Sequence, residues 1–224
     1  MPRTHKRAMP LIVFEGLDGS GKSSLMNALE VDLLRQNWRV VRTREPGGTP
    51  LGDELRNMIL RTEGPAPTAR TELLLYEASR AQHVDEVIAP ALRQNHWVLC
   101  DRFSASSIAF QAGGRKISQE WVESLNEFAT AGVLADLTVL LDLSVEESRR
   151  RRQVRESGRG AQEDRIESEA DTFHTRVRES FLEQSRVAAN WLVLDAALSP
   201  DILLEKLLQH LQKANWLGHG RQQK

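Results

Sequence analysis

A phosphate-binding loop near the start of the chain limits the fold more than any other feature of the sequence. Residues 11–14 are apolar (Leu-Ile-Val-Phe), and residues 16–23 then follow the P-loop pattern Gly-x4-Gly-Lys-Ser. The glycines permit a tight turn whose backbone N–H groups point at a phosphate, and the next helix adds its positive N-terminal end. Lys22 can reach the β- and γ-phosphates, and the Ser23 hydroxyl can ligate Mg²⁺. A strand–loop–helix unit that binds a nucleoside triphosphate is therefore predicted.

The size and charge of the chain exclude several classes of protein. Its 224 residues are 40% hydrophobic and 27% charged, which suits one α/β domain or at most two small ones. The net charge of −1 gives no overall field for nucleic acid or an acidic membrane surface, so neither is expected as a partner. No apolar run approaches the roughly 20 residues of a membrane span.

The single cysteine and the two ends of the chain complete the expected organisation. Cys100 has no partner for an intrachain disulfide, which fits a reducing cytoplasm, and it is read as a core residue. The first nine residues are basic but lack the apolar core of a secretory signal. We expect a disordered basic arm over 1–10, a single P-loop domain over 11–213, and a loose tail over 214–224.

Short apolar segments alternate with helical patterns along the chain. Strands are predicted at 11–15, 38–43, 96–100, 137–142 and 191–195. Helices are predicted from the P-loop to about 37, over 68–95 with a break near Pro90, after Ser118 and Ser144, and from Pro200, at the first helical position, to Leu211. In the helix after Ser118, one face is expected to carry Trp121, Leu125 and Phe128. This alternation predicts an α/β fold with a five-stranded, doubly wound parallel sheet flanked by helices.

Charged residues follow the second and third predicted strands, at the sheet edge where open α/β folds bind ligands. Residues 43–49 read Thr-Arg-Glu-Pro-Gly-Gly-Thr, a charged pair beside a rigid turn, which is either a ligand contact or a plain connection. Asp101 can hold Mg²⁺ and Arg102 can bind a phosphate through its planar fork. The alternative for these two residues is an intrachain salt bridge.

A basic stretch and an aromatic–arginine pair are further candidates. Residues 149–165 hold seven arginines against three acidic residues, a local charge of +4, with glycines at two positions. This predicts a mobile lid over about 149–166 that closes on phosphates, against a solvated charged face or a nucleic-acid patch. Tyr76 and Arg80 share a helical face and can stack on and hydrogen-bond a base; the alternative is a core tyrosine beside a surface arginine.

Together these segments resemble the thymidylate kinase family, the nucleoside monophosphate kinases that phosphorylate dTMP. The resemblance rests on residues 14–24 (FEGLDGSGKSS), 43–49 (TREPGGT), 101–111 (DRFSASSIAFQ) and 164–167 (DRIE). It implies the P-loop nucleoside monophosphate kinase fold with a mobile lid. It also implies ATP and Mg²⁺ as cofactors, dTMP as the small-molecule substrate, a step towards dTTP for DNA replication, and a cytoplasmic homodimer.

The resemblance also implies roles for individual residues. The dTMP site would comprise Asp18 at the sugar, Arg56 and Arg102 at the phosphate, Tyr76 on the thymine ring, and Glu45, Pro46, Leu60, Arg80, Ser107, Phe110 and Gln111. The ATP site would comprise Gly16, Leu17, Asp18, Gly19, Ser20, Gly21, Lys22, Ser23, Ser24 and Arg149, with Ser23 and Asp101 holding Mg²⁺. Catalysis would involve Lys22, Asp18, Asp101, Arg102 and a lid arginine, either Arg155 or Arg159, because residues 17–20 contain no arginine. Phe110 stands where the family usually has tyrosine, so one hydroxyl near the sugar is lost.

Two other functions compete with this interpretation. A deoxynucleoside kinase would phosphorylate the nucleoside and would not need Arg56 and Arg102 as a phosphate clamp. A P-loop switch or ATP-driven assembly factor would act through a partner, but the chain has no Asn-Lys-x-Asp motif and no apolar strand that ends in Asp-Glu.

Overall fold

The sheet of the computed structural model contains five parallel strands in the order β2-β3-β1-β4-β5. The structure describes residues 9–159 and 163–217, so most of the expected arm and the end of the expected tail lie outside the described residues. The strands are β1 (Leu11–Glu15), β2 (Val40–Arg44), β3 (Trp97–Asp101), β4 (Leu137–Asp142) and β5 (Trp191–Asp195). The predicted parallel sheet is confirmed, and each predicted strand end lies within two residues of the observed one.

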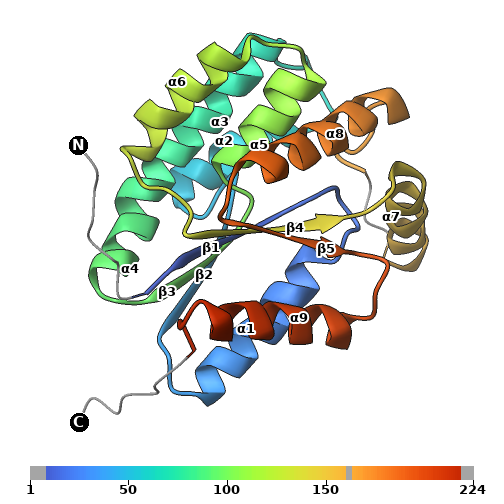
Figure 1. Ribbon diagram of the computed structural model, residues 1–224. Helices are drawn as coiled ribbons and strands as arrows, with labels where there is room; N and C mark the ends of the chain where they lie inside the picture. Colours follow the sequence, from blue (N-terminus) through green and yellow to red (C-terminus); the bar gives the residue numbers. More distant parts are fainter. Residues whose placement is uncertain (1–8, 160–162, 218–224) are drawn as a thin grey trace.

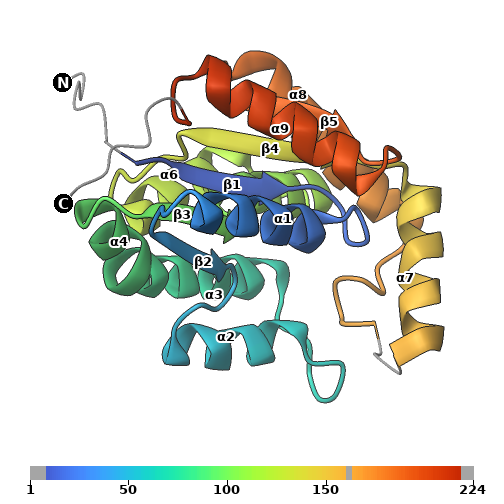
Figure 2. The ribbon, with the colours of Figure 1, turned by 90° about the horizontal axis from the view of Figure 1, so that it is seen from below.

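Strand register brings the functional sequence segments to one edge of the sheet. Asp101 of β3 pairs with Phe14 of β1 on one side and with Arg44 of β2 on the other. The P-loop, the 45–49 turn and Arg102 therefore all begin at the same edge, because parallel strands end together. Figure 2 shows α7 (Val145–Arg159) at the end of the sheet to which β1 and β4 point.

Two groups of helices cover the two faces of the sheet (Figure 1). On one face α1 (Lys22–Arg35) packs against α9 (Pro200–Lys213). The buried leucines of these two helices are Leu25, Leu29, Leu33, Leu203, Leu207 and Leu211, which follow the predicted helical spacing. The other face carries α2 (Pro50–Leu60), α3 (Ala69–His83), α4 (Ala89–Arg93), α5 (Ser104–Ser107), α6 (Gln119–Thr130) and α8 (Asp171–Val187).

Several helix starts follow from the local sequence. The Ser199 hydroxyl accepts from the N–H of Ile202, and Pro200 occupies the first helical position, as predicted. The Ser144 hydroxyl likewise accepts from the N–H of Glu147 at 3.2 Å. Helix α2 has the same kind of start, with Thr49 as its cap before Pro50, but the sequence analysis did not predict it.

Two expectations about helices are wrong in detail. The chain does not break at Pro90: α3 runs into a π-helical segment, η1 (Val84–Ile88), which continues directly into α4. Pro90 is the second residue of α4. In α6 the buried face is formed by Val122, Asn126, Ala129 and Thr130, so the predicted apolar face is not the buried one, and its Trp121 and Phe128 are exposed.

Candidate active site

The P-loop folds tightly between β1 and α1, and its lysine curls back across it. Gly16 has a φ of +131°, and a Cβ there would lie 2.4 Å from the Leu141 carbonyl oxygen, so only glycine fits. The Lys22 ammonium donates to the carbonyl oxygens of Gly16 (3.0 Å) and Leu17 (3.1 Å). Burial and the neighbouring Arg102 lower the pKa of Lys22. The ammonium is thus held over the loop that the sequence predicts to bind phosphate.

Ser23 and Asp101 meet beside this loop. The Ser23 hydroxyl donates to Oδ2 of Asp101 at 3.3 Å, while Oδ1 of Asp101 is buried without a hydrogen-bond partner. A hydroxyl next to an unsatisfied buried carboxylate oxygen fits a Mg²⁺ ion that completes its shell with phosphate oxygens and water. The described residues contain no group of three or more His, Cys, Asp or Glu that could hold a metal alone.

Arg102 joins the end of β3 to the P-loop. It adopts a φ of +69°, a left-handed conformation that costs a non-glycine residue about 1–3 kcal/mol. Its guanidinium donates to Oδ1 of Asp18 at 2.8 Å, and its central carbon lies 4.9 Å from the ring centroid of Phe110. The left-handed backbone conformation of Arg102 therefore directs its largely buried guanidinium towards the contact between the P-loop and residues 101–111.

The carboxyls around Arg102 have opposite pKa shifts. Burial would raise the pKa of Asp18, but Arg102 and Lys22 hold it well below its usual range. Glu15 is fully buried, and burial raises its pKa to about 7 even though Arg102 and the Ser106 hydroxyl lower it. Asp18 is thus an ionised acceptor at neutral pH, whereas Glu15 titrates there.

A cavity opens next to Asp18, between the sheet edge and helices α2 and α3. Its walls also include a π-helical segment, η2 (Ile108–Gly114), which follows α5. The lining residues are Asp18, Glu45, Pro46, Arg56, Leu60, Tyr76, Arg102, Ser106, Ser107, Phe110, Gln111, Asp164 and Ile166. The walls combine two arginines, two aromatic rings and a side-chain amide, which are groups that suit a phosphate and a planar base.

Comparison with known proteins decides the family. A model of the family described as "Thymidylate kinase" matches residues 14–207. The chain belongs to the thymidylate kinase family. It is 70% identical over 204 residues to the thymidylate kinase of Bdellovibrio bacteriovorus, covering 91% of this chain and 95% of that protein. The thymidylate kinase of Finegoldia magna is 41% identical over 206 residues, covering 92% of this chain and 99% of that protein.

Family membership sets aside the deoxynucleoside kinase and the P-loop switch as alternatives. All but one of the residues that the thymidylate kinase resemblance implied for dTMP line the cavity. The exception is Arg80. Three lining residues were not predicted for the site, namely Ser106, Asp164 and Ile166. Ser106 precedes the predicted site residue Ser107, and Asp164 and Ile166 lie in the 164–167 segment that carries the family resemblance. The sequence therefore held enough information to include all three.

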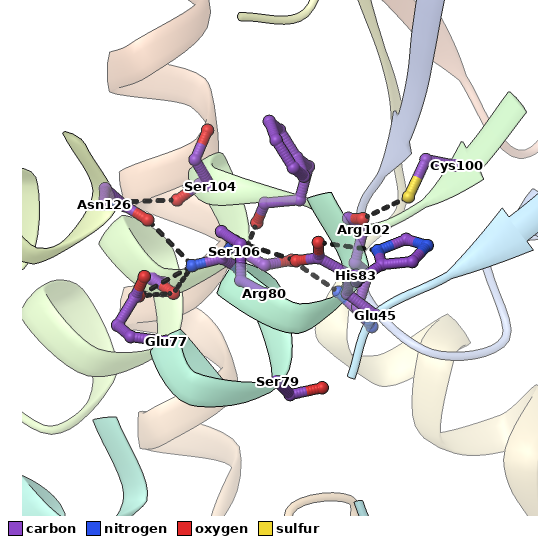
Figure 3. Close-up of polar contacts among 12 residues, drawn as sticks. Glu45, Glu77, Ser79, Arg80, His83, Cys100, Arg102, Ser104, Ser106 and Asn126 are labelled. Atoms are coloured by element: carbon purple, nitrogen blue, oxygen red, sulfur yellow. Dashed lines mark hydrogen bonds and ion pairs between the residues drawn. The ribbon is translucent and has the colours of Figure 1, made fainter. Parts of the chain in front are cut away.

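Arg80 does not line the cavity in this member of the thymidylate kinase family; it lies among Glu45, Glu77 and Asn126 (Figure 3). Its side chain is buried and donates to Glu45, Glu77, Ser107 and Asn126 and to the Phe103 carbonyl oxygen. The alternative of a surface arginine is wrong, because Arg80 is 1% exposed and pairs with Glu77 of its own helix and with Glu45 of the 45–49 turn. Its hydrogen bond to Ser107, at 2.9 Å, connects it to the cavity.

Side chains of α3 fix the 45–49 turn, and the turn accepts a hydrogen bond from Arg56. The Glu45 carboxylate lies between Arg80, at 2.8 Å, and Nδ1 of His83, at 3.0 Å (Figure 3). The next peptide, Glu45–Pro46, is cis. The Pro46 carbonyl oxygen accepts from Arg56 at 3.1 Å. Glu45 and Pro46 both line the cavity, so the turn forms part of its wall.

The basic stretch is largely helical in this kinase. Residues 149–159 belong to α7, so the lid predicted as a flexible excursion between two helices begins inside a helix. Arg149 pairs with Asp171 at 2.7 Å, and Arg155 pairs with Glu167 at 2.7 Å. Arg151, which was not singled out, contacts the P-loop carbonyl oxygen of Gly19 at 3.4 Å. The Arg159 side chain and residues 160–162 lie outside the described part of the chain.

Within residues 9–159 and 163–217, no helix is both long and apolar enough to cross a membrane.

Cys100 is buried in β3, which confirms its expected place in the core.

The raised pKa of Glu15 predicts a pH dependence of stability. The folded protein keeps the Glu15 proton up to about pH 7, whereas the unfolded chain loses it near 4.5. The stability from Glu15 is thus complete below the unfolded pKa and is lost as pH rises through the folded pKa, a change of about 3 kcal/mol. Asp18, with its lowered pKa, is ionised in both states over this range.

We expect the free energy of unfolding in urea to depend less on pH in Glu15→Gln than in the wild type, between about pH 4.5 and about pH 8. Parallel pH profiles for the two proteins would contradict the assignment.

Proposed function

We propose how this enzyme, a thymidylate kinase that phosphorylates dTMP to dTDP with ATP, holds its two substrates. The observation that carries the proposal is the cavity, which brings Arg56, Arg102, Tyr76 and Gln111 together beside Asp18 of the P-loop. In this arrangement dTMP occupies the cavity and ATP occupies the P-loop, so that the dTMP phosphate meets the γ-phosphate of ATP between Arg102 and Lys22.

The acceptor fits the cavity group by group. Arg102 and Arg56 bind the dTMP phosphate, because both guanidiniums line the same cavity and offer paired N–H donors. Asp18, ionised next to Arg102, accepts from the 3′-hydroxyl of the sugar. Thymine stacks on Tyr76, whose phenol stays neutral because burial raises its pKa. Leu60 and Phe110 supply apolar wall, and Ser107 and Gln111 face the base edge.

Phosphoryl transfer needs alignment and positive charge rather than covalent help from the protein. The P-loop N–H groups and Lys22 bind the β- and γ-phosphates, and Arg149 is assigned to the same nucleotide. Mg²⁺, held by Ser23 and Asp101, would neutralise phosphate charge. Arg155 or Arg159 supplies the catalytic lid cation, and in the case of Arg155 its ion pair with Glu167 must open first.

A cytoplasmic homodimer is part of the same proposal. Large apolar side chains are exposed on the outer helices α3 and α6 and just beyond α6, namely Leu74, Trp121, Phe128 and Leu134. Surface of this kind is typical of a protein–protein interface. A sedimentation mass equal to the 25.3 kDa of one chain would contradict the dimer.

Removing one arm of the phosphate clamp tests the proposed site. We expect Arg56→Ala to weaken dTMP binding by about tenfold or more, since a charge-assisted hydrogen bond contributes about 1.5–3 kcal/mol. Titration calorimetry with dTMP measures this effect. Thymidine, which lacks the phosphate, serves as the control and should bind wild type and variant alike. Equal dTMP affinity for the two proteins would show that Arg56 does not hold the phosphate.

A further inference from the structure

A buried carboxylate lies directly behind the base-side wall of the cavity. Glu72, in the first turn of α3, is 1% exposed and has no role in the substrate contacts described above. It accepts from Nε2 of Gln111 at 3.0 Å, from Nε and Nη2 of Arg115 at 3.1 Å each, and from Nη2 of Arg165 at 2.8 Å. One carboxylate thus connects a cavity-lining amide to two arginines on different segments.

The charge of Glu72 determines which end of the Gln111 amide can face it. Burial would raise the pKa of Glu72, but hydrogen bonds from Arg115, Gln111 and Arg165 keep it below its usual value, so the group is ionised. An ionised carboxylate only accepts hydrogen bonds. The donating –NH₂ end of Gln111 must therefore point at Glu72, and the accepting oxygen Oε1 is the end left for the cavity.

That oxygen distinguishes between pyrimidines. Thymine and uracil carry an N–H donor at ring position 3, whereas cytosine carries an acceptor there. If Oε1 of Gln111 lies at this edge, it accepts a hydrogen bond from thymine or uracil. With cytosine it faces the acceptor nitrogen at position 3, and no hydrogen bond forms.

We propose that Glu72 is a positioning residue that sets base specificity, by fixing the Gln111 amide so that its oxygen reads the N3–H of the substrate. This inference rests on the proposed placement of the dTMP base against Tyr76, which lies one helical turn from Glu72 on α3. Glu72 acts through Gln111 and does not itself touch the base.

The experiment compares dTMP with dCMP as acceptors for the wild type and for Glu72→Gln. A neutral amide at 72 can donate or accept, so Gln111 is free to turn over. We expect the ratio of kcat/KM for dTMP to that for dCMP to fall by about tenfold or more, mainly through a higher KM for dTMP. The KM for ATP should change by less than about twofold. An unchanged acceptor ratio would overturn the proposal.

Glu169→Gln is the matched control. Glu169 is the other carboxylate that pairs with Arg115, and it has no contact with Gln111 among the hydrogen bonds of the described residues. This variant loosens Arg115 while leaving the amide held. Its acceptor ratio should stay within about twofold of the wild type. If both variants change the ratio equally, Glu72 has only a structural role.

Two further measurements keep the proposal testable if Glu72→Gln does not fold. In the wild type, the Gln111 side-chain amide protons should exchange slowly with solvent in NMR spectra. Their signals are assigned by their loss in Gln111→Met, and fast exchange would overturn the proposal.

Gln111→Met should itself lower the ratio of kcat/KM for dTMP to that for dCMP. If it leaves dTMP turnover and the ratio unchanged, the base does not lie here and the proposed substrate site fails. If it lowers the ratio while Glu72→Gln does not, only the positioning role of Glu72 fails.

Discussion

Arg102→Ala is expected to lower kcat/KM for dTMP by about 10²–10³, the loss that follows removal of one preorganised donor from a transition state. The guanidinium is preorganised because it is nearly buried, bonded to Asp18 at 2.8 Å and stacked over Phe110. In the proposed complex it binds the acceptor phosphate, whose negative charge must approach that of ATP. Alanine removes the cation without filling its place, so the two anions repel each other during transfer.

Two further variants isolate this effect. Arg102→Lys keeps the charge but loses the planar fork, and its activity should lie between those of wild type and alanine. Arg44, which pairs with Asp101 in strand register, has a side chain that is 56% exposed and bonded to Asp53. Arg44→Ala should retain kcat/KM within about twofold. Near-normal turnover by Arg102→Ala, with a melting temperature like the wild type, would show that Arg102 is not the clamp.

Lys22→Ala is expected to lower kcat by about 10³ through loss of the ammonium that meets the γ-phosphate. The Lys22 side chain is almost buried and is anchored on the carbonyl oxygens of Gly16 and Leu17, so its charge is fixed over the loop and little reorganisation is needed. Single-turnover kinetics measure the chemical step, and titration calorimetry with dTMP measures acceptor binding separately.

The affinity for dTMP should change by less than about twofold in this variant, because Lys22 does not line the cavity. Lys206→Ala, an exposed lysine on α9, is the matched control and should retain full kcat. A loss of less than about tenfold in the chemical step of Lys22→Ala would contradict its role at the transferred phosphate.

The sheet and the P-loop could be predicted because their determinants are local. Strands β1 and β4 are mainly apolar and buried on both faces, and the loop glycines are marked by their own spacing. Helix α2 was missed although Thr49 and Pro50 form a recognisable start, because the turn before it drew the interpretation towards a loop. Trp121 was misplaced because both faces of α6 carry apolar residues, and packing against α3 selects the other one.

The site was predicted unevenly for a different reason. Most of the residues that line the cavity lie in the segments that carry the family resemblance, so most of them were found. The residues that hold those motifs in place carry no local signal. Arg80 resembles a surface arginine until Glu45 and Asn126 are brought to it from two other parts of the chain, beside Glu77 of its own helix. Glu72 likewise resembles an ordinary first-turn glutamate, and only the approach of Gln111 and two arginines shows its environment.

The most direct test of the substrate assignment is an ADP-release assay with Mg·ATP and a panel of acceptors comprising dTMP, dUMP, dCMP, dGMP, UMP and thymidine. A monophosphate kinase whose acceptor phosphate is clamped by Arg56 and Arg102 should turn over dTMP rapidly and thymidine very little. Turnover of thymidine but not dTMP, or slow ATP loss that no acceptor stimulates, would contradict both the clamp and the placement of dTMP in the cavity.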